Sequence, residues 1–64
     1  MNDTLTSDSA EIGMVCVDLD GDRVVIDRIR DHKRAEVGIW HNERWSYDGT
    51  EIRYDELTPT GEVI

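Results

Sequence analysis

The strongest constraint on the fold is an acidic, glycine-containing turn between two apolar runs. The segment Asp20-Gly21 lies between Met14-Val15-Cys16-Val17 and Val24-Val25-Ile26. An Asp-Gly pair between β-branched runs is a strong signal for a β-hairpin, because a type I′ turn needs positive φ at both central residues. We therefore expect a hairpin with strands over residues 12–19 and 23–30.

The side chains of this hairpin also predict its register. With Asp20-Gly21 as the loop, Asp18 lies opposite Arg23 on one face. The branched apolar residues then gather on the other face: Val15, Val17, Val24 and Ile26. A slip of one residue would place Val17 against Arg23 and mix the two faces, so we predict the unslipped register.

Further strands are expected at short intervals over residues 35–41, 44–47, 51–54 and 61–64. With Asn42-Glu43 as a loop, Trp40 and Trp45 become cross-strand partners. Gly38 predicts a bulge or a close approach by a neighbouring backbone.

Two other segments are expected to interrupt strands. Asp48-Gly49 is interpreted as a second Asp-Gly turn. Pro59 lacks an N–H group and is expected to stop a strand ladder.

Short strands with turn signals predict an all-β fold, either a small SH3-like barrel or a strongly curved antiparallel sheet of about five strands. The pattern over residues 12–64 resembles SH3-like small barrels of the KOW and Tudor type. The resemblance depends on the strand spacing, on Gly13 before the first strand, and on Asp55-Glu56-Leu57 before the last. It implies a five-stranded barrel, and an open meander that dimerises is the alternative.

The chain is expected to form one domain over residues 11–64 after a flexible tail over residues 1–10. The tail is rich in Thr, Ser, Asp and Asn, and Leu5 is its only large apolar residue after Met1. Such a segment buries too little surface to offset the entropy lost on ordering.

The charge is strongly acidic, with fifteen Asp and Glu against seven Lys and Arg. This composition resembles that of cytoplasmic, halophilic proteins from salt-accumulating microbes, where a carboxylate surface maintains solubility at high salt. An ordinary acidic protein is the alternative. The N-terminus lacks a basic region and an apolar core, so we expect no signal peptide, no membrane segment and a cytoplasmic location.

No metal or cofactor site is expected. Asp18, Asp20 and Asp22 resemble the start of a calcium loop, but Arg23 and Ile29 replace its required Gly and Glu. A hairpin turn is the simpler interpretation, with weak cation binding as the alternative. Cys16, His32 and His41 are the only soft-ligand candidates, and their spacing matches no metal motif.

An enzyme is not expected, because the chain has no nucleophile motif and no phosphate-binding glycine loop. We instead expect an interaction module that binds a protein partner, with a homodimer as one form. Its candidate partner surface consists of Trp40, Trp45 and Tyr47, because aromatic residues are favoured interface anchors.

The alternative is nucleic-acid binding through a local basic patch, defined as Arg28, Arg30, Lys33 and Arg34. Basic groups with aromatic side chains nearby suit single-stranded nucleic acid. The simpler interpretation is that these cations pair with Asp27, Asp31 and Glu36, and the net charge of −8 opposes binding of a polyanion. A carboxylate mimic of nucleic acid is a third interpretation.

Overall fold

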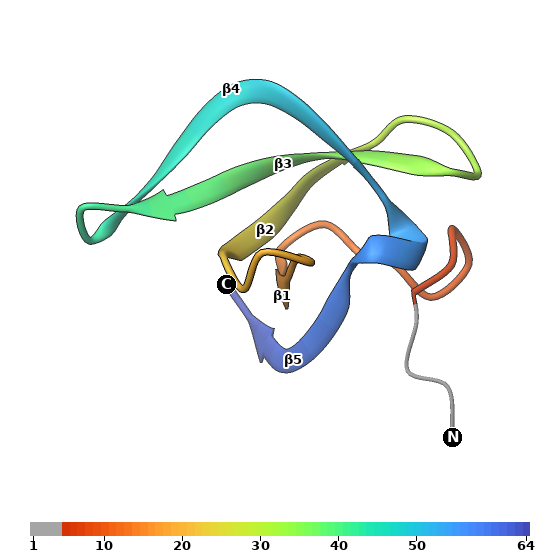
Figure 1. Cartoon of the computed structure of the whole chain (residues 1–64). Coiled ribbons are helices and arrows are strands. Elements are labelled where there is room, and N and C mark those ends of the chain that lie inside the picture. The colour runs from red at the N-terminus through yellow and green to blue at the C-terminus, as the bar shows by residue number, and fades with distance from the viewer. Residues whose placement is uncertain (1–4) are drawn as a thin grey trace.

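Five antiparallel strands form one strongly curved sheet (Figure 1). The structure is a computed structural model that describes residues 5–64. The strands are β1 (Met14–Val17), β2 (Arg23–Ile29), β3 (Arg34–His41), β4 (Arg44–Arg53) and β5 (Thr58–Val63). A single 3₁₀ turn, η1 (Tyr54–Glu56), precedes β5. The predicted all-β fold is therefore confirmed.

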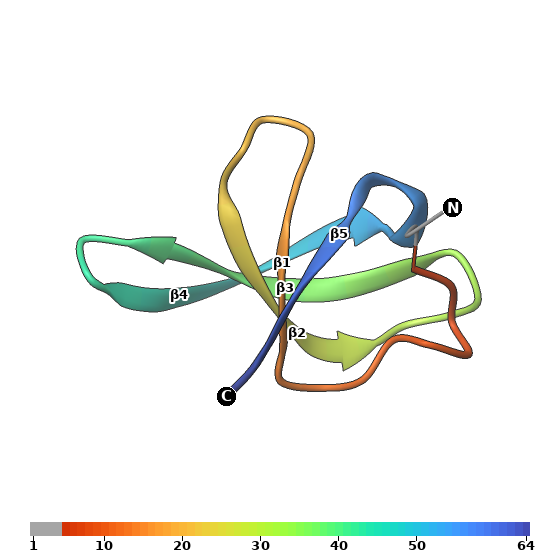
Figure 2. The ribbon, with the colours of Figure 1, turned by 90° about the horizontal axis from the view of Figure 1, so that it is seen from below.

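The strand order is β4-β3-β2-β1-β5, so β4 and β5 form the two edges. Within residues 5–64 no ladder joins these edges, and the sheet is curved but open. Figure 2 shows β5 alongside β1, with which it pairs. The register shifts within the β1–β5, β2–β3 and β3–β4 ladders, and such bulges bend and twist a sheet.

The predicted register of the first hairpin is wrong by one residue. Cys16 lies opposite Val24, and Val17 lies opposite Arg23. The reason is a loop of three residues rather than two: the N–H of Asp18 donates to the carbonyl of Asp22, and Gly21 has a φ of 85°. A type I turn followed by a left-handed glycine is the common three-residue hairpin loop.

The Asp18 side chain stabilises this loop. Its Oδ1 accepts hydrogen bonds from the N–H groups of Asp20 and Asp22, both at 2.9 Å. Asp side chains commonly bond to the backbone two residues on, and this favours turns. Asp18 therefore belongs to the loop and forms no pair with Arg23.

The second predicted hairpin is confirmed. Asn42 and Glu43 have φ values of 51° and 62°, so both central residues are left-handed as a type I′ turn requires. His41 pairs with Arg44, and Trp40 pairs with Trp45. The two-residue loop therefore sets the register of the tryptophan pair.

The interpretation of Asp48-Gly49 as a turn is wrong, because β4 continues through it. The β3–β4 register shifts by two residues between the Gly38–Tyr47 pair and the Glu36–Glu51 pair. Gly49 has a φ of 82° within this irregularity. The bulge lets the long strand β4 arch over the core, as Figure 1 shows.

The expectation that Pro59 ends a strand is also wrong. Pro59 lies within β5 and pairs with Cys16. Because β5 is an edge strand, a residue without an N–H group is tolerated there.

The core lies between the sheet and two segments that cover one of its faces, residues 5–13 (called the N-terminal segment) and η1. Its buried members are Leu5, Ala10, Cys16, Val24, Ile26, Ala35, Val37, Tyr54 and Leu57. The expectation that residues 5–10 remain outside the core is therefore wrong, since Leu5 is 4% exposed. The part of the predicted tail before Leu5 lies outside the described residues.

The opposite face of the sheet is called the outer face below. Side chains alternate between the two faces along a strand. In β1, β2 and β3 the outer-facing residues are therefore the sequence neighbours of the core residues. Val15 and Val25 form a cross-strand pair on this face and are almost fully buried. The predicted register assumed that one face of the first hairpin is apolar and the other polar. Because apolar residues are buried on both faces, this assumption does not distinguish the two registers.

Candidate functional site

Three aromatic side chains gather on the outer face, and we call Trp40, Trp45 and Tyr47 the aromatic surface. Trp45 and Tyr47 are two residues apart on β4, and Trp45 is the partner of Trp40 on β3, so all three lie on one side. Trp40 is 38% exposed and Tyr47 is 55% exposed. None of the three belongs to the core cluster. The structure thus brings together the predicted partner surface.

The rings of Trp40 and Trp45 contact each other edge to face. Their ring centroids are 4.9 Å apart with an interplanar angle of 65°. Edge-to-face contacts of this kind add about 0.5–1.5 kcal/mol beyond area burial. Trp45 is half-buried, so Trp40 is the more exposed tryptophan. The pair forms a rigid end of the aromatic surface next to the β3–β4 turn.

Tyr47 packs against Gly38, its cross-strand partner. A Cβ atom on Gly38 would lie 2.6 Å from Cε1 and 2.7 Å from Cδ1 of the ring. Glycine therefore lets the ring approach the backbone of β3, and Tyr47 remains 55% exposed. The predicted bulge at Gly38 is confirmed by the register shift between Glu36 and Gly38. The close approach is made by the Tyr47 side chain and not, as the alternative had it, by a backbone.

Arg23 and Glu62 border the aromatic surface. The Arg23 guanidinium carbon is 5.6 Å from the Trp40 ring centroid, within the range of a cation–π contact. Arg23 Nη2 is also 2.7 Å from Glu62 Oε1. These contacts join β2, β3 and β5 at the border of the surface. Sequence reasoning missed this role of Arg23 because the predicted register paired it with Asp18.

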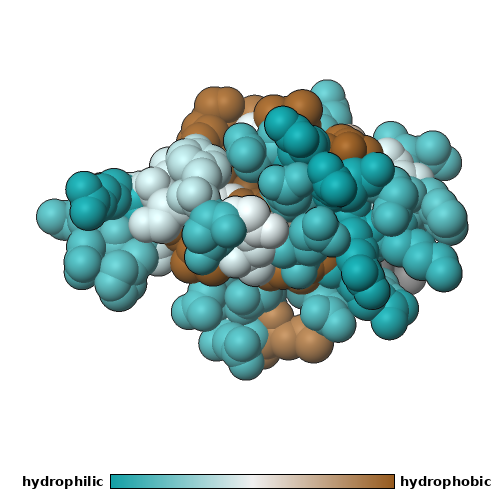
Figure 3. All heavy atoms as spheres, turned by 90° about the horizontal axis from the view of Figure 1, so that it is seen from above, coloured by the Kyte–Doolittle hydropathy of each residue, from teal (hydrophilic) through white to brown (hydrophobic). Residues whose placement is uncertain are grey.

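Figure 3 shows the molecule from the side on which β3 and β4 lie in Figure 1. Hydrophilic spheres cover most of this side, and pale spheres of intermediate hydropathy gather toward the β3–β4 turn. Tryptophan and tyrosine combine an apolar body with a polar group and are favoured at interfaces. An exposed group of such residues on a small acidic protein is suited to contact with a partner.

The basic patch lies at the other end of β3. Arg30 Nη1 is 3.2 Å from Glu36 Oε2, and Arg30 Nε is 3.6 Å from Glu51 Oε2. The pairing of one patch cation with Glu36 is thus confirmed. Within residues 5–64, no carboxylate lies within ion-pair distance of Arg28, Lys33 or Arg34.

The structure does not bring the basic patch and the aromatic surface together. Arg34 and Trp40 are six residues apart on the same strand, which corresponds to roughly 20 Å at the rise of a β-strand. The expected combination of this basic patch with the aromatic surface is therefore not formed.

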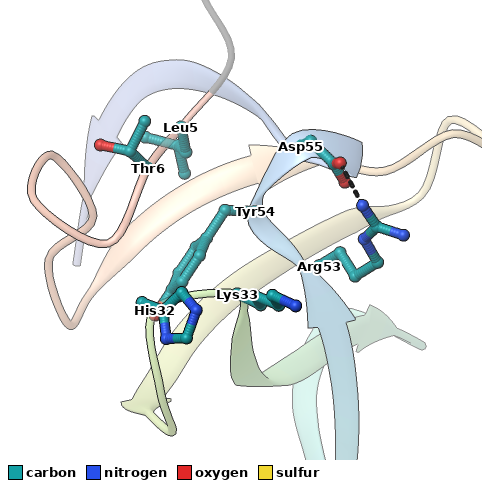
Figure 4. A pocket seen from close by; sticks show the side chains of 7 residues that line it. All are labelled: Leu5, Thr6, His32, Lys33, Arg53, Tyr54 and Asp55. Atoms are coloured by element: carbon teal, nitrogen blue, oxygen red, sulfur yellow. Dashed lines mark hydrogen bonds and ion pairs between the residues drawn. The ribbon is translucent and has the colours of Figure 1, made fainter.

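A hollow of about 170 Å³ lies beside the β2–β3 loop (Figure 4). Its lining residues are Leu5, Thr6, His32, Lys33, Arg53, Tyr54 and Asp55. Arg53 is paired with Asp55 at 2.7 Å, and the Tyr54 hydroxyl donates to the carbonyl of Asp31. These contacts occupy several of the polar groups at the hollow.

The soft-ligand candidates lie in separate places. Cys16 is buried in the core, His32 lies in the β2–β3 loop, and His41 ends β3. Within residues 5–64, one group of potential metal ligands is compact enough to hold an ion: Asp18, Asp20 and Asp22. Their carboxylate oxygens lie within 4.8 Å of one another. Asp18 Oδ1 already accepts two backbone hydrogen bonds, so the hairpin turn accounts for this cluster.

The shifted pKa values belong to groups that maintain the fold. Hydrogen bonds from the N–H groups of Lys33 and Arg34 lower the pKa of Asp31. Hydrogen bonds from the hydroxyl and N–H of Thr50 lower the pKa of Asp48 at the β4 bulge. Burial raises the pKa values of Cys16 and Tyr54. These shifts are explained by loop stabilisation and core packing.

Comparison with known proteins gave no relative: no family model, curated protein or solved structure matched the chain. Among the described residues, no helix has the length and apolar character needed to cross a membrane.

Proposed function

We propose that this chain is a non-enzymatic interaction module that binds a protein partner through the aromatic surface. The observation that carries the proposal is the exposure of Trp40 and Tyr47 on the face opposite the core. Burying an aromatic side chain at an interface contributes a large apolar area, and such residues dominate binding energy. Neither residue belongs to the core cluster, and both remain exposed although Val15 and Val25 are buried on the same face.

The buried residues support a non-enzymatic role. Within residues 5–64, every fully buried side chain is hydrophobic, and none is a buried polar or charged group. Active sites generally contain titratable groups whose pKa is shifted by burial in a cleft. Asp31 and Asp48, whose pKa values are lowered, are exposed and bond to their own loops. Burial raises the pKa values of Cys16 and Tyr54, but both belong to the core cluster, and the Tyr54 hydroxyl donates to the Asp31 carbonyl.

Three further properties are part of the proposal. The resemblance to SH3-like small barrels remains part of the proposal, with a five-stranded sheet that is strongly curved but open. The single, buried thiol of Cys16 supports a cytoplasmic location, because reducing compartments keep thiols unpaired. The net charge of −8 supports a halophilic origin.

Selection from a random peptide library displayed on phage tests the proposed function. We expect peptides that bind the wild-type chain and lose most of their binding to Trp40→Ala and Tyr47→Ala. Ile12→Ala is the matched control, because Ile12 is another exposed apolar residue, 65% accessible and outside the aromatic surface. Selected peptides that ignore both aromatic substitutions, or a library that yields no binder, would refute the proposal.

A second copy of the chain is one candidate partner. Size-exclusion chromatography with light scattering tests it, because a dimer that Tyr47→Ala converts to a monomer would identify the aromatic surface as a homodimer interface. A monomer that is unchanged by concentration would restrict the proposal to other proteins.

Nucleic-acid binding is the second candidate function, supported by the absence of ion-pair partners for Arg28, Lys33 and Arg34 among residues 5–64. The test adds a mixed pool of short RNA and DNA to the same column. Co-elution with the pool that Arg28→Glu together with Arg30→Glu abolishes would establish this alternative. Elution that is independent of the pool would exclude it.

A further inference from the structure

We propose that the partner contributes an extended, basic segment that pairs as an additional strand with the free edge of β4 over Arg44–Tyr47. The segment would lie beside the rings of Trp45 and Tyr47. This inference rests on the proposed function and specifies its partner.

The register of β3 and β4 indicates which backbone groups are free. In an antiparallel ladder, hydrogen-bonded pairs alternate with pairs whose N–H and C=O groups point away from each other. The pair next to a two-residue loop, here His41 and Arg44, is hydrogen-bonded. The Trp40–Trp45 and Gly38–Tyr47 pairs therefore fall at non-hydrogen-bonded positions, and the N–H and C=O groups of Trp45 and Tyr47 point to the outer edge of β4.

The same two residues thus offer both parts of a strand-binding site. Their backbone groups point along the plane of the sheet toward an added strand, and their side chains lie on the outer face beside it. Peptides that add to a sheet edge obtain affinity from main-chain hydrogen bonds and specificity from alternate side chains. Trp45 and Tyr47 supply these alternate contacts.

The rest of the sheet edges is less suitable for pairing. In β5, Pro59 lacks an N–H group, and Gly61 with a φ of 88° marks an irregularity. In β4, the register shift around Gly49 ends the regular edge after Tyr47. Proline and bulges are the usual protection of edges against pairing. Arg44–Tyr47 has neither, and within residues 5–64 it is the longer of the two regular stretches of β4; the other is Glu51–Arg53.

The charge of the chain favours a basic segment. The net charge is −8. Glu43 and Asp48 lie at the two ends of Arg44–Tyr47, and Arg44 is the one cation within this stretch. The Trp40 face already receives the guanidinium of Arg23, which shows that this surface accommodates arginine. An acidic protein also attracts basic partners over long distances, and salt weakens this attraction.

The test uses a synthetic eight-residue peptide in which arginine alternates with valine, and a counterpart with glutamate in place of arginine. Amide hydrogen exchange of the chain is followed by NMR. We expect the arginine peptide to protect the Trp45 and Tyr47 amides, which are exposed at the edge, and the glutamate peptide to have no effect. Because the chain has 64 residues, it can also be synthesised with an N-methyl group on Tyr47, which removes the outward N–H and keeps the ring.

N-methylation of Tyr47 should weaken binding of the arginine peptide by on the order of tenfold, as expected for the loss of one hydrogen bond and close strand approach. N-methylation of Leu19, at the tip of the first loop, is the control and should leave binding unchanged. Circular dichroism checks the fold of both chains. If the modified chain does not fold, amide protection in the unmodified chain decides the question.

The outcomes separate this inference from the proposed function. Binding without protection of the Trp45 and Tyr47 amides would overturn strand addition and leave the aromatic surface as the site. Equal binding of the glutamate peptide would overturn the basic character of the partner. If the arginine peptide does not bind while library peptides do, the inference is wrong and the proposed function stands; if neither binds, both fall.

Discussion

Replacing Leu5 by alanine tests whether the N-terminal segment is part of the folded domain. Leu5 is 4% exposed and belongs to the core cluster, although a tail was expected there. Leu→Ala substitutions in cores cost about 2–5 kcal/mol. Because Leu5 lies outside the strands and η1, where the backbone can relax into the space, we expect the lower end, about 2 kcal/mol.

This loss is large for a domain of 64 residues. Stabilities of roughly 0.05–0.15 kcal/mol per residue correspond to about 3–10 kcal/mol for the chain. With a urea m-value of about 1 kcal/mol per M, typical of small proteins, the unfolding midpoint should fall by about 2 M.

Urea unfolding followed by tryptophan fluorescence measures the midpoint, and Ile12→Ala serves as the control. Ile12 is 65% exposed, so its substitution should change stability by less than about 0.5 kcal/mol. If Leu5→Ala and Ile12→Ala have the same small effect, Leu5 is not a core residue and the described packing of this segment is wrong.

Three other predictions follow from the turns and charges. Glu43→Gly should raise the melting temperature, because a left-handed φ of 62° costs a non-glycine residue about 1 kcal/mol; a lower melting temperature would contradict a type I′ turn. Hydrogen bonds from Lys33 and Arg34 lower the pKa of Asp31. Its contribution to stability is therefore present above the ordinary pKa near 3.8 and is lost as pH falls through the lowered pKa. The difference in urea midpoint between wild type and Asp31→Ala should shrink between pH 5 and pH 2, and a constant difference would refute the assignment. Raising KCl from 0.1 to 1 M shortens the Debye length from about 10 to about 3 Å and should stabilise a chain of net charge −8; an unchanged melting temperature would show that self-repulsion is unimportant.

Local signals predicted the second hairpin well. The segment Asn42-Glu43 leaves little choice of loop, so the Trp40–Trp45 pair followed from sequence. Tyr47 was assigned to the same surface because aromatic residues are favoured interface anchors, and the register of β3 and β4 places it there. The candidate site could therefore be predicted where one turn determines the register.

The first hairpin and the bulge in β4 could not be predicted in this way. An Asp-Gly pair supplies a left-handed glycine that suits a two-residue turn, a three-residue loop or a bulge equally well. Gly21 lies in a three-residue loop, and Gly49 lies in a bulge. Tertiary packing decides among them, because Val15 and Val25 are buried on the face opposite the core.

The contribution of the N-terminal segment was also hidden from local reasoning. Its polar composition predicts a tail, but Leu5 and Ala10 belong to the core cluster. Two apolar residues without a strand or helix period give no signal in the sequence. Arg23 was predicted to pair with Asp18, whereas it contacts Trp40. The difference follows from the wrong register predicted for β1 and β2.

Chemical-shift mapping by NMR most directly tests whether the aromatic surface is the binding site. The chain, labelled with ¹⁵N, would be titrated with the strongest peptide from the display selection. We predict that the largest changes occur at the indole N–H groups of Trp40 and Trp45 and at the Tyr47 amide. Changes concentrated instead at Arg28, Arg30, Lys33 and Arg34, or at the residues around the hollow beside Tyr54, would contradict the proposed function.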